Sequence, residues 1–305
     1  MLIDVRVDLE RELAVDLVAI EDERPRDQIV GRCGRDARDG HENKRKPLHG
    51  RTLACAALGF GSLLLAGACR LDLGQVDSAF YDWDGRKVHC AVDIDASAHV
   101  SLDSIMTGLD RARDQGEVLE LYTHDPGHTV ASDTIEAVLA GAQARGLAFV
   151  TFADILAGAA PPSGTGGLAL SFDDEHIADW YAARPMFQRY GARLTFWIAY
   201  YDHASATEKA ELHELAADGH AIEAHTVMHQ RAPAYVEQFG LDTWLSDEVQ
   251  PSIDWLRQDG YTIDAFAYPY GARTDETDDA VLGRVSIVRS VVYPWDSPAT
   301  SPCPY

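Results

Sequence analysis

The sequence has no close cysteine pairs, few basic residues and no long apolar run. Five cysteines are present without a CxxC pair, which argues against a structural zinc cluster. Lys and Arg number 26 against 49 Asp and Glu, and the net charge of -23 argues against a nucleic-acid partner because phosphates would be repelled. The main apolar stretch, about 52–68, is short for a bilayer span of roughly 20 residues. These features are typical of an acidic globular protein.

The stretch KRKPLHGRTLACAALGFGSLLLAGAC has a basic start, an apolar core and small residues before Cys69, which is the layout of a secretory signal. LLLAGAC also resembles the bacterial lipobox, whose cysteine is lipidated. We therefore expect a signal peptide over 44–69 and export to the bacterial cell envelope as a lipoprotein anchored at Cys69, or secretion. A short transmembrane or core helix is the alternative. Residues 1–43 are expected to be an unstructured leader or a mis-assigned start, and 70–305 the catalytic domain.

From about residue 86, β-branched apolar runs alternate with amphipathic stretches, which predicts an α/β parallel sheet or barrel. Strands are expected at 88–94, 117–122, 148–152, 168–172, 194–199, 221–224, 264–268 and 286–291. Helices are expected at 101–115, 132–146, 177–190, 205–218, 245–258 and 275–284. The one linker-like piece is GAAPPSGTGG, 158–167.

Polar side chains follow five of the predicted strands. They are Asp93 and Asp95, His124, Asp173 and Asp174, His225 and His229, and Tyr268 and Tyr270. In parallel α/β barrels the active site collects at the carboxyl ends of the strands. We therefore expect these side chains to meet on one rim.

The pair HTVMH lets His225 and His229 face one ion, and Asp174 would complete a His₂-carboxylate set for a divalent metal, most simply zinc. Asp173 can then take a proton from the metal-activated water, and His124 can act as the acid. The backbone N–H of Tyr270 is a candidate oxyanion donor. This set predicts hydrolysis of an amide or ester.

Each motif also has a structural interpretation. A pair of aspartates at a strand end is often a turn or a helix cap, and an HxxxH pair is often on the surface. YTHDPGHT contains a second such pair, so His124 and His128 could both be solvated loop residues. Asp93 and Asp95 could cap their strand. The convergence of several strand ends is what favours a metal site.

LALSFDDEH, EAHTVMHQ and FAYPYGAR resemble the first three motifs of the polysaccharide deacetylases, the NodB-homology group or carbohydrate esterase family 4. The resemblance implies a distorted (β/α)7-type barrel. It also implies Asp173 as the base, Asp174, His225 and His229 as metal ligands, and the Tyr270 N–H as the oxyanion donor.

The family's last motif carries the catalytic acid and should follow these three, yet the similar segment is 116–156, ahead of the first motif. A circular permutation accounts for this order, with 158–167 joining the usual ends and His124 as the acid. Export would place Cys90 and Cys303 in an oxidising compartment, where a disulfide between them would join the new ends.

The sequence also departs from the family pattern. Glu175 replaces a Gly, Gln230 a Pro, and Ala267 stands where an Arg often orients the base. The acidic partner of the site is left open among Asp93, Asp95 and Asp296.

We expect a metal-dependent deacetylase acting on N- or O-acetylated polysaccharide, such as chitin oligomers or peptidoglycan, with Tyr268 and Trp295 as candidate sugar contacts. The alternatives are a catalytically impaired glycan-binding lipoprotein and a small-molecule amidohydrolase. Sequence alone does not distinguish the glycan, the acetyl linkage or the metal.

Overall fold

The computed structural model describes residues 74–159, 165–292 and 303. The predicted leader 1–43, the signal peptide 44–69 with Cys69, and Trp295 and Asp296 lie outside the described residues, as does 160–164 of the predicted linker. Among the described residues, no helix combines the length and apolar character needed to cross a bilayer.

Seven parallel strands close into a barrel. They are β2 (Val88–Asp93), β3 (Val118–Thr123), β5 (Gly167–Asp174), β6 (Thr195–Ile198), β7 (Ala221–Ala224), β8 (Ala265–Ala267) and β9 (Ile287–Val292). Neighbouring strands in this order pair with each other, including β2 with β3 and β3 with β5. β9 pairs with β2, and this last pairing closes the ring. The predicted (β/α)7-type barrel is confirmed.

Two short strands add to this ring. β1 (Phe80–Tyr81) runs antiparallel to β3, and β4 (Ala148–Phe149) lies beside β5. The strand predicted at 148–152 ends early because Thr151 caps a helix, its side chain accepting a hydrogen bond from the Asp154 N–H.

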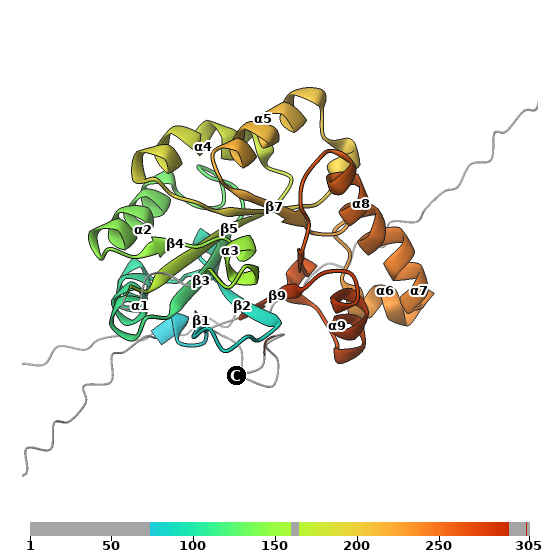
Figure 1. Cartoon of the computed structure of the whole chain (residues 1–305), viewed down its shortest axis with the longest axis horizontal. Helices are drawn as coiled ribbons and strands as arrows, with labels where there is room; N and C mark the ends of the chain where they lie inside the picture. The colour runs from blue at the N-terminus through green and yellow to red at the C-terminus, as the bar shows by residue number, and fades with distance from the viewer. Residues whose placement is uncertain (1–73, 160–164, 293–302, 304–305) are drawn as a thin grey trace, which may run out of the picture. The chain divides into compact units, whose positions relative to one another are not determined.

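Helices surround the barrel (Figure 1). They are α1 (Leu102–Gln115), α2 (Ser132–Ala144), α3 (Phe152–Leu156), α4 (Ile177–Tyr190), α5 (Ala206–Ala217), α6 (Ala232–Phe239), α7 (Leu241–Trp244), α8 (Gln250–Gln258) and α9 (Asp275–Leu282). Short helical turns lie at Gly74–Val76, Ala96–Ala98, Tyr201–His203 and Pro269–Gly271. The helix predicted at 245–258 is divided into a π-helical turn, Leu245–Val249, and α8, and α3, α6 and α7 were not predicted.

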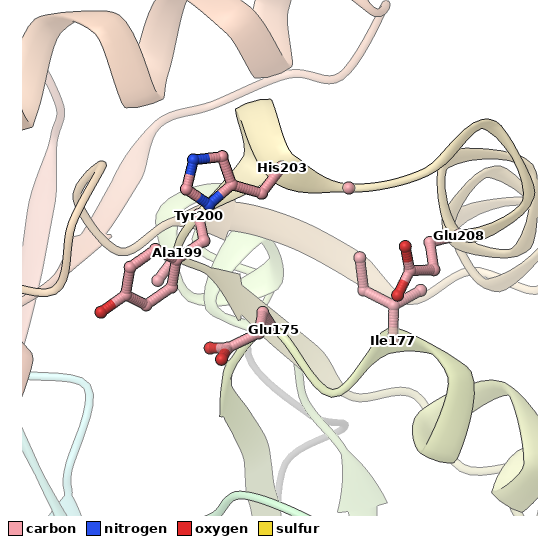
Figure 2. Close-up of a pocket in the computed structure, with 7 residues that line it drawn as sticks. Glu175, Ile177, Ala199, Tyr200, His203 and Glu208 are labelled. Carbon is pink, nitrogen blue, oxygen red and sulfur yellow. The ribbon is translucent and has the colours of Figure 1, made fainter.

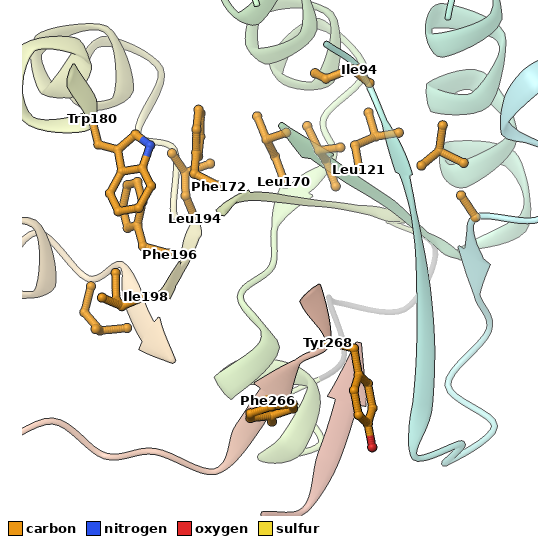
Figure 3. Close-up of a cluster of buried hydrophobic side chains, with 14 of the residues drawn as sticks. Ile94, Leu121, Leu170, Phe172, Trp180, Leu194, Phe196, Ile198, Phe266 and Tyr268 are labelled. Atoms are coloured by element: carbon orange, nitrogen blue, oxygen red, sulfur yellow. The ribbon is translucent and has the colours of Figure 1, made fainter. Parts of the chain in front are cut away.

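The main core fills the space between barrel and helices. Phe172 and Phe196 from neighbouring strands stack at 5.5 Å, and Trp180 of α4 lies 5.0 Å from Phe196 (Figure 3). A second cluster fills the barrel around Val118, Trp197 and Ala265. β3 is buried along its whole length and has apolar side chains on both faces, as expected for a parallel strand covered on both sides, while its one charged residue, Glu120, pairs with His89. The barrel is therefore a rigid support for side chains at its rim.

The closed ring places β3 next to β5, so the segment with His124 adjoins the strand that ends in Asp173 and Asp174. A closed ring of strands has the same neighbours wherever the chain is cut. The circular permutation therefore stays a prediction.

Cys90 of β2 forms a disulfide with Cys303, 213 residues away. Cross-linking so distant a pair restricts the unfolded chain, so replacing both cysteines by Ala should lower the free energy of unfolding by about 2–5 kcal/mol. Urea denaturation of the full chain, with and without reductant, measures this. The double variant should be insensitive to reductant. A double variant as stable as the oxidised wild type would contradict the expectation.

Candidate functional site

The carboxyl ends of the strands bring the predicted ligands together. Asp174 ends β5, and His225 and His229 follow β7. The Asp174 Oδ1 atom lies 3.0 Å from His229 Nε2 and 3.6 Å from His225 Nε2. One ligand atom from each residue lies within 4.8 Å of the others. The sequence-predicted set therefore forms one cluster.

The backbone at this rim is held in an unusual conformation. Asp174, Thr226, His229 and Tyr270 all have positive φ, at 83°, 69°, 54° and 57°. Such conformations cost on the order of 1–3 kcal/mol each for residues other than glycine and cluster at functional sites. The strained residues therefore lie in the motifs from which the site was predicted.

His225 is prepared as a neutral ligand. Its Nδ1 lies 2.8 Å from the carbonyl oxygen of Ala267, which fits an Nδ1–H donor and leaves the Nε2 lone pair facing Asp174. Burial lowers the pKa of His225 to about 4, against the opposing charge of Asp173. The imidazole is therefore uncharged at neutral pH, as a metal ligand must be.

Asp174 is held as a carboxylate. Burial alone would raise its pKa, but the adjacent imidazoles of His229 and His225 outweigh burial and lower the pKa. Its Oδ1 is buried and has no well-aligned hydrogen bond, although two imidazole nitrogens face it. A buried acceptor ringed by donor atoms of this type fits a divalent metal such as zinc.

Asp173 has a partner that the sequence reasoning missed. Arg289 of β9 donates from Nη2 to Asp173 Oδ2, and both side chains are buried. Arg289 of β9 is the cross-strand partner of Ala267 of β8. In the family pattern the arginine stands at the position of Ala267, whereas here it comes from the neighbouring strand. Asp173, the residue predicted to be the base, therefore has an arginine partner despite Ala267. A charged residue within the apolar run IVRSVV was the available signal, because such residues are rarely buried unless paired.

The guanidinium of Arg289 also lies over aromatic rings, 4.7 Å from the centre of Tyr122 and 5.5 Å from that of Trp197. These contacts fix its position within the barrel. Asp173 Oδ2 in turn lies 3.9 Å from His225 Nε2. Arg289 thus holds the carboxylate of Asp173 beside the cluster of Asp174, His225 and His229.

His124 forms an ion pair with Asp95, with 2.5 Å between His124 Nδ1 and Asp95 Oδ2. The other oxygen of Asp95 accepts hydrogen bonds from the hydroxyls of Thr123 and Thr129. Burial opposes protonation of His124, but the hydrogen bond to Asp95 and the charges of the rim carboxylates outweigh it and raise its pKa to about 9. His124 is therefore a protonated imidazole at neutral pH.

Of the acidic partners left open by the sequence, Asp95 is thus the one that pairs with His124. Asp93 instead accepts a hydrogen bond of 2.8 Å from the Asp95 N–H, and burial with the charge of Asp95 raises its pKa to about 6.

Tyr270 lies at the edge of the cluster, 44% exposed. Its ring centre is 4.7 Å from that of His229, and the guanidinium carbon of Arg231 lies 3.9 Å from the centre of the Tyr270 ring. The role of the Tyr270 N–H as an oxyanion donor stays a prediction.

The expectation that Tyr268 contacts sugar is wrong. Its side chain is fully buried and stacks on Trp244, with 6.2 Å between ring centres, while Phe266 packs at its edge. Side chains two residues apart on a strand point the same way, and Phe266 and Tyr268 (Figure 3) both pack against Trp244 in the main core.

Two cavities share Tyr200, and one of them is lined by His229 of the ligand cluster. A groove of about 390 Å³ is lined by the exposed Met228, Phe239 and Tyr270 together with Tyr235 and Arg231. Figure 2 shows the second pocket, about 330 Å³, with the carboxylates of Glu175 and Glu208 and the ring of His203 on its wall. The ligand cluster is therefore open to a substrate larger than its acyl group.

Residues 161–283 match the family model described as polysaccharide deacetylase. The match contains Asp173, Asp174, His225, His229 and Tyr270; Asp95, His124 and Arg289 lie outside it. No curated protein sequence matches the chain.

Solved structures with similar folds include a candidate polysaccharide deacetylase from Bacillus anthracis (16% identity, TM-score 0.46), covering 57% of this chain and 58% of that one. The chain thus spans just over half of that protein. For IcaB from Ammonifex degensii (21% identity, TM-score 0.46), the match covers 59% of this chain and 88% of that one. For the BpsB deacetylase domain from Bordetella bronchiseptica (17% identity, TM-score 0.43), it covers 57% of this chain and 94% of that one. At TM-scores below 0.5 we take no residue role from these neighbours.

Proposed function

We propose, from the match of residues 161–283 to the polysaccharide deacetylase family model, that the chain is a metal-dependent hydrolase that removes acetyl groups from polysaccharide. The observation that carries the proposal is the cluster of Asp174, His225 and His229 beside the Arg289-bound carboxylate of Asp173. A binding protein needs a ligand pocket but has no use for a base and a protonated acid on opposite sides of that cluster.

Asp174, His225 and His229 would hold a divalent metal, with zinc as the first choice for two imidazoles and a carboxylate. When bound, such an ion polarises a carbonyl oxygen and lowers the pKa of a water molecule. Asp173, oriented by Arg289, takes a proton from the water whose oxygen forms a bond to the acetyl carbon. The Tyr270 N–H faces the carbonyl oxygen as it gains charge.

His124 supplies the second proton. As the bond from the acetyl carbon to nitrogen or oxygen breaks, the protonated imidazole donates to the leaving amine or alkoxide. The products are acetate and a sugar amine or hydroxyl. Asp95 keeps the imidazole oriented and charged for this step.

Replacing Asp95 by Asn should move the alkaline limb of the pH–rate profile to lower pH. The charges of Asp95, Asp173 and Asp174 keep His124 protonated up to a pKa of about 9, and the acid is active only below its pKa. Loss of the Asp95 charge lowers that pKa, so activity is lost earlier as pH rises. The profile of kcat/KM between neutral pH and pH about 10 measures this. An unchanged alkaline limb would contradict the role of His124.

The substrate is an acetylated polysaccharide laid across the groove of Met228, Tyr235, Phe239 and Tyr270, whose flat apolar faces suit sugar rings. We further propose that the chain acts outside the cytoplasm, anchored through Cys69 or secreted. The layout of residues 44–69 supports export.

The test is acetate release by the purified full chain from N-acetylglucosamine oligomers, peptidoglycan and acetylated xylan. We expect release from at least one of them with zinc, its loss after dialysis against a chelator, and its return when zinc is added back. Release that is indifferent to chelation would exclude the metal, and no release from any substrate would exclude the function for this set.

A further inference from the structure

A second group of imidazoles and carboxylates lies outside the proposed catalytic set. Asp125 and His128 belong to the loop after β3, and His176 and Asp179 to the start of α4. His176 Nδ1 lies 3.4 Å from Asp125 Oδ2, and His128 Nε2 lies 4.0 Å from Asp179 Oδ1. One ligand atom each of Asp125, His128 and Asp179 lies within 4.8 Å of the others. Two segments distant in sequence thus bring four ligand-type side chains together.

Asp125 is the buried member of this group. The residue is 9% exposed, and its Oδ1 has no hydrogen-bond partner in the described part of the chain. Burial and the neighbouring carboxylate of Asp179 raise its pKa, although the imidazoles of His176 and His128 oppose this. A buried carboxylate oxygen without a donor is costly, and a bound cation removes that cost.

Hydrogen bonds fix the two segments that carry these residues, the loop with Asp125 and His128 and the start of α4. The carbonyl oxygen of Asp125 accepts hydrogen bonds from the N–H groups of His128 and Thr129, at 3.1 and 3.0 Å, which folds His128 back over Asp125. On the other side, Trp180 Nε1 donates to the carbonyl of His124 at 2.7 Å and fixes α4 against the loop. The ligand-type side chains therefore face each other without rearrangement of the chain.

We propose that Asp125, His128, His176 and Asp179 bind a second divalent transition-metal ion, separate from the catalytic one. Two imidazoles and two carboxylates are a ligand set that suits zinc. Ligand atoms about 2.0–2.1 Å from a tetrahedral zinc lie roughly 3.4 Å apart. The ligand atoms of Asp125, His128 and Asp179 already lie within 4.8 Å of one another, so the exposed His128 and Asp179 would close in on the ion, and His176 would approach from its place beside Asp125. Two carboxylates also offset the partial positive charge at the start of α4.

The ion would join the loop that begins at His124 to the helix that follows Asp174. It is therefore a positioning site for the acid, with no contact to the reacting atoms. It goes beyond the proposed function and does not depend on it.

Metal stoichiometry of the full chain tests the proposal. After dialysis against a chelator, zinc is titrated by calorimetry and the bound metal is counted by mass spectrometry. We expect two equivalents for the wild type, one for His128→Ala/Asp179→Asn, one for His229→Ala, and none for the triple variant. His128 and Asp179 have 68% and 43% of their side chains exposed, so their replacement leaves the core intact.

The matched control is Asp202→Asn/His203→Ala, which removes another exposed pair, 3.6 Å apart, and should keep two equivalents. A wild type whose single equivalent of zinc is kept in His128→Ala/Asp179→Asn would overturn the proposal. So would a second equivalent that survives in His128→Ala/Asp179→Asn, or one that is lost equally in the control. A chain that binds two ions but releases no acetate would keep this site while refuting the proposed function.

Discussion

Replacing Asp173 by Asn is expected to reduce acetate release by about a hundredfold to ten-thousandfold, the usual contribution of general acid–base catalysis. The amide keeps the shape of the side chain but cannot take a proton from water. Because Asp173 is outside the ligand set, zinc content should stay unchanged. The measurement is kcat/KM on the best substrate, with bound zinc counted in the same sample.

The control for this variant is Asp133→Asn, which makes the same change at an exposed position in the first turn of α2. Its activity should equal that of the wild type. If Asp173→Asn retained full activity with zinc bound, the base would have to be another residue, and the assignment by motif would be wrong.

Replacing Arg289 by Met is expected to lower the free energy of unfolding by about 3–5 kcal/mol, because one partner of a buried ion pair is removed. Asp173 would then be a buried carboxylate without its arginine. Acetate release should also fall, since the base loses the group that orients it. Urea denaturation of the full chain gives the free energy, and the acetate assay gives the activity.

The double variant Asp173→Asn/Arg289→Met separates the two effects. With both charges gone, no buried charge is left unpaired, so the double variant should be more stable than the sum of the single losses, by roughly 0.5–3 kcal/mol for residues in contact. Its activity should stay as low as that of Asp173→Asn. Strict additivity of the stability losses would show that the two residues do not interact in solution.

Arg289 also weakens the alternative interpretation that the chain is a glycan-binding protein without catalytic activity. That reading drew on Ala267, where the family pattern often has an arginine. The register of β8 and β9 places Arg289 directly across from Ala267, and its guanidinium reaches Asp173. The missing arginine therefore no longer favours lost turnover, whereas the altered motif ends at Glu175 and Gln230 remain.

The barrel and most of the site were predictable from local sequence patterns. Strand periodicity located the seven barrel strands, and residues directly after them identified Asp174, His225 and His229. The role of Arg289 was not predicted because its partner, Asp173, is 116 residues away and the contact depends on the register between strands. Asp95 was one of three candidates because only the folded chain shows which carboxylate reaches His124.

Tyr268 shows the opposite failure. It was assigned to the rim by its place at a strand end, yet Phe266 two residues earlier already pointed to the face that packs on the helices. The position of a residue along a strand predicts how near it lies to the rim. Whether its side chain points into the barrel or toward the helices depends on the alternation of side chains along the strand.

The most direct test of the account measures acetate and new free amine together, from N-acetylglucosamine oligomers treated with the zinc-loaded full chain and with Asp173→Asn. We expect acetate from the wild type, with a matching amount of amine if the bond is an amide, and at least about a hundredfold less acetate from the variant. Equal acetate from both proteins would contradict the proposed site.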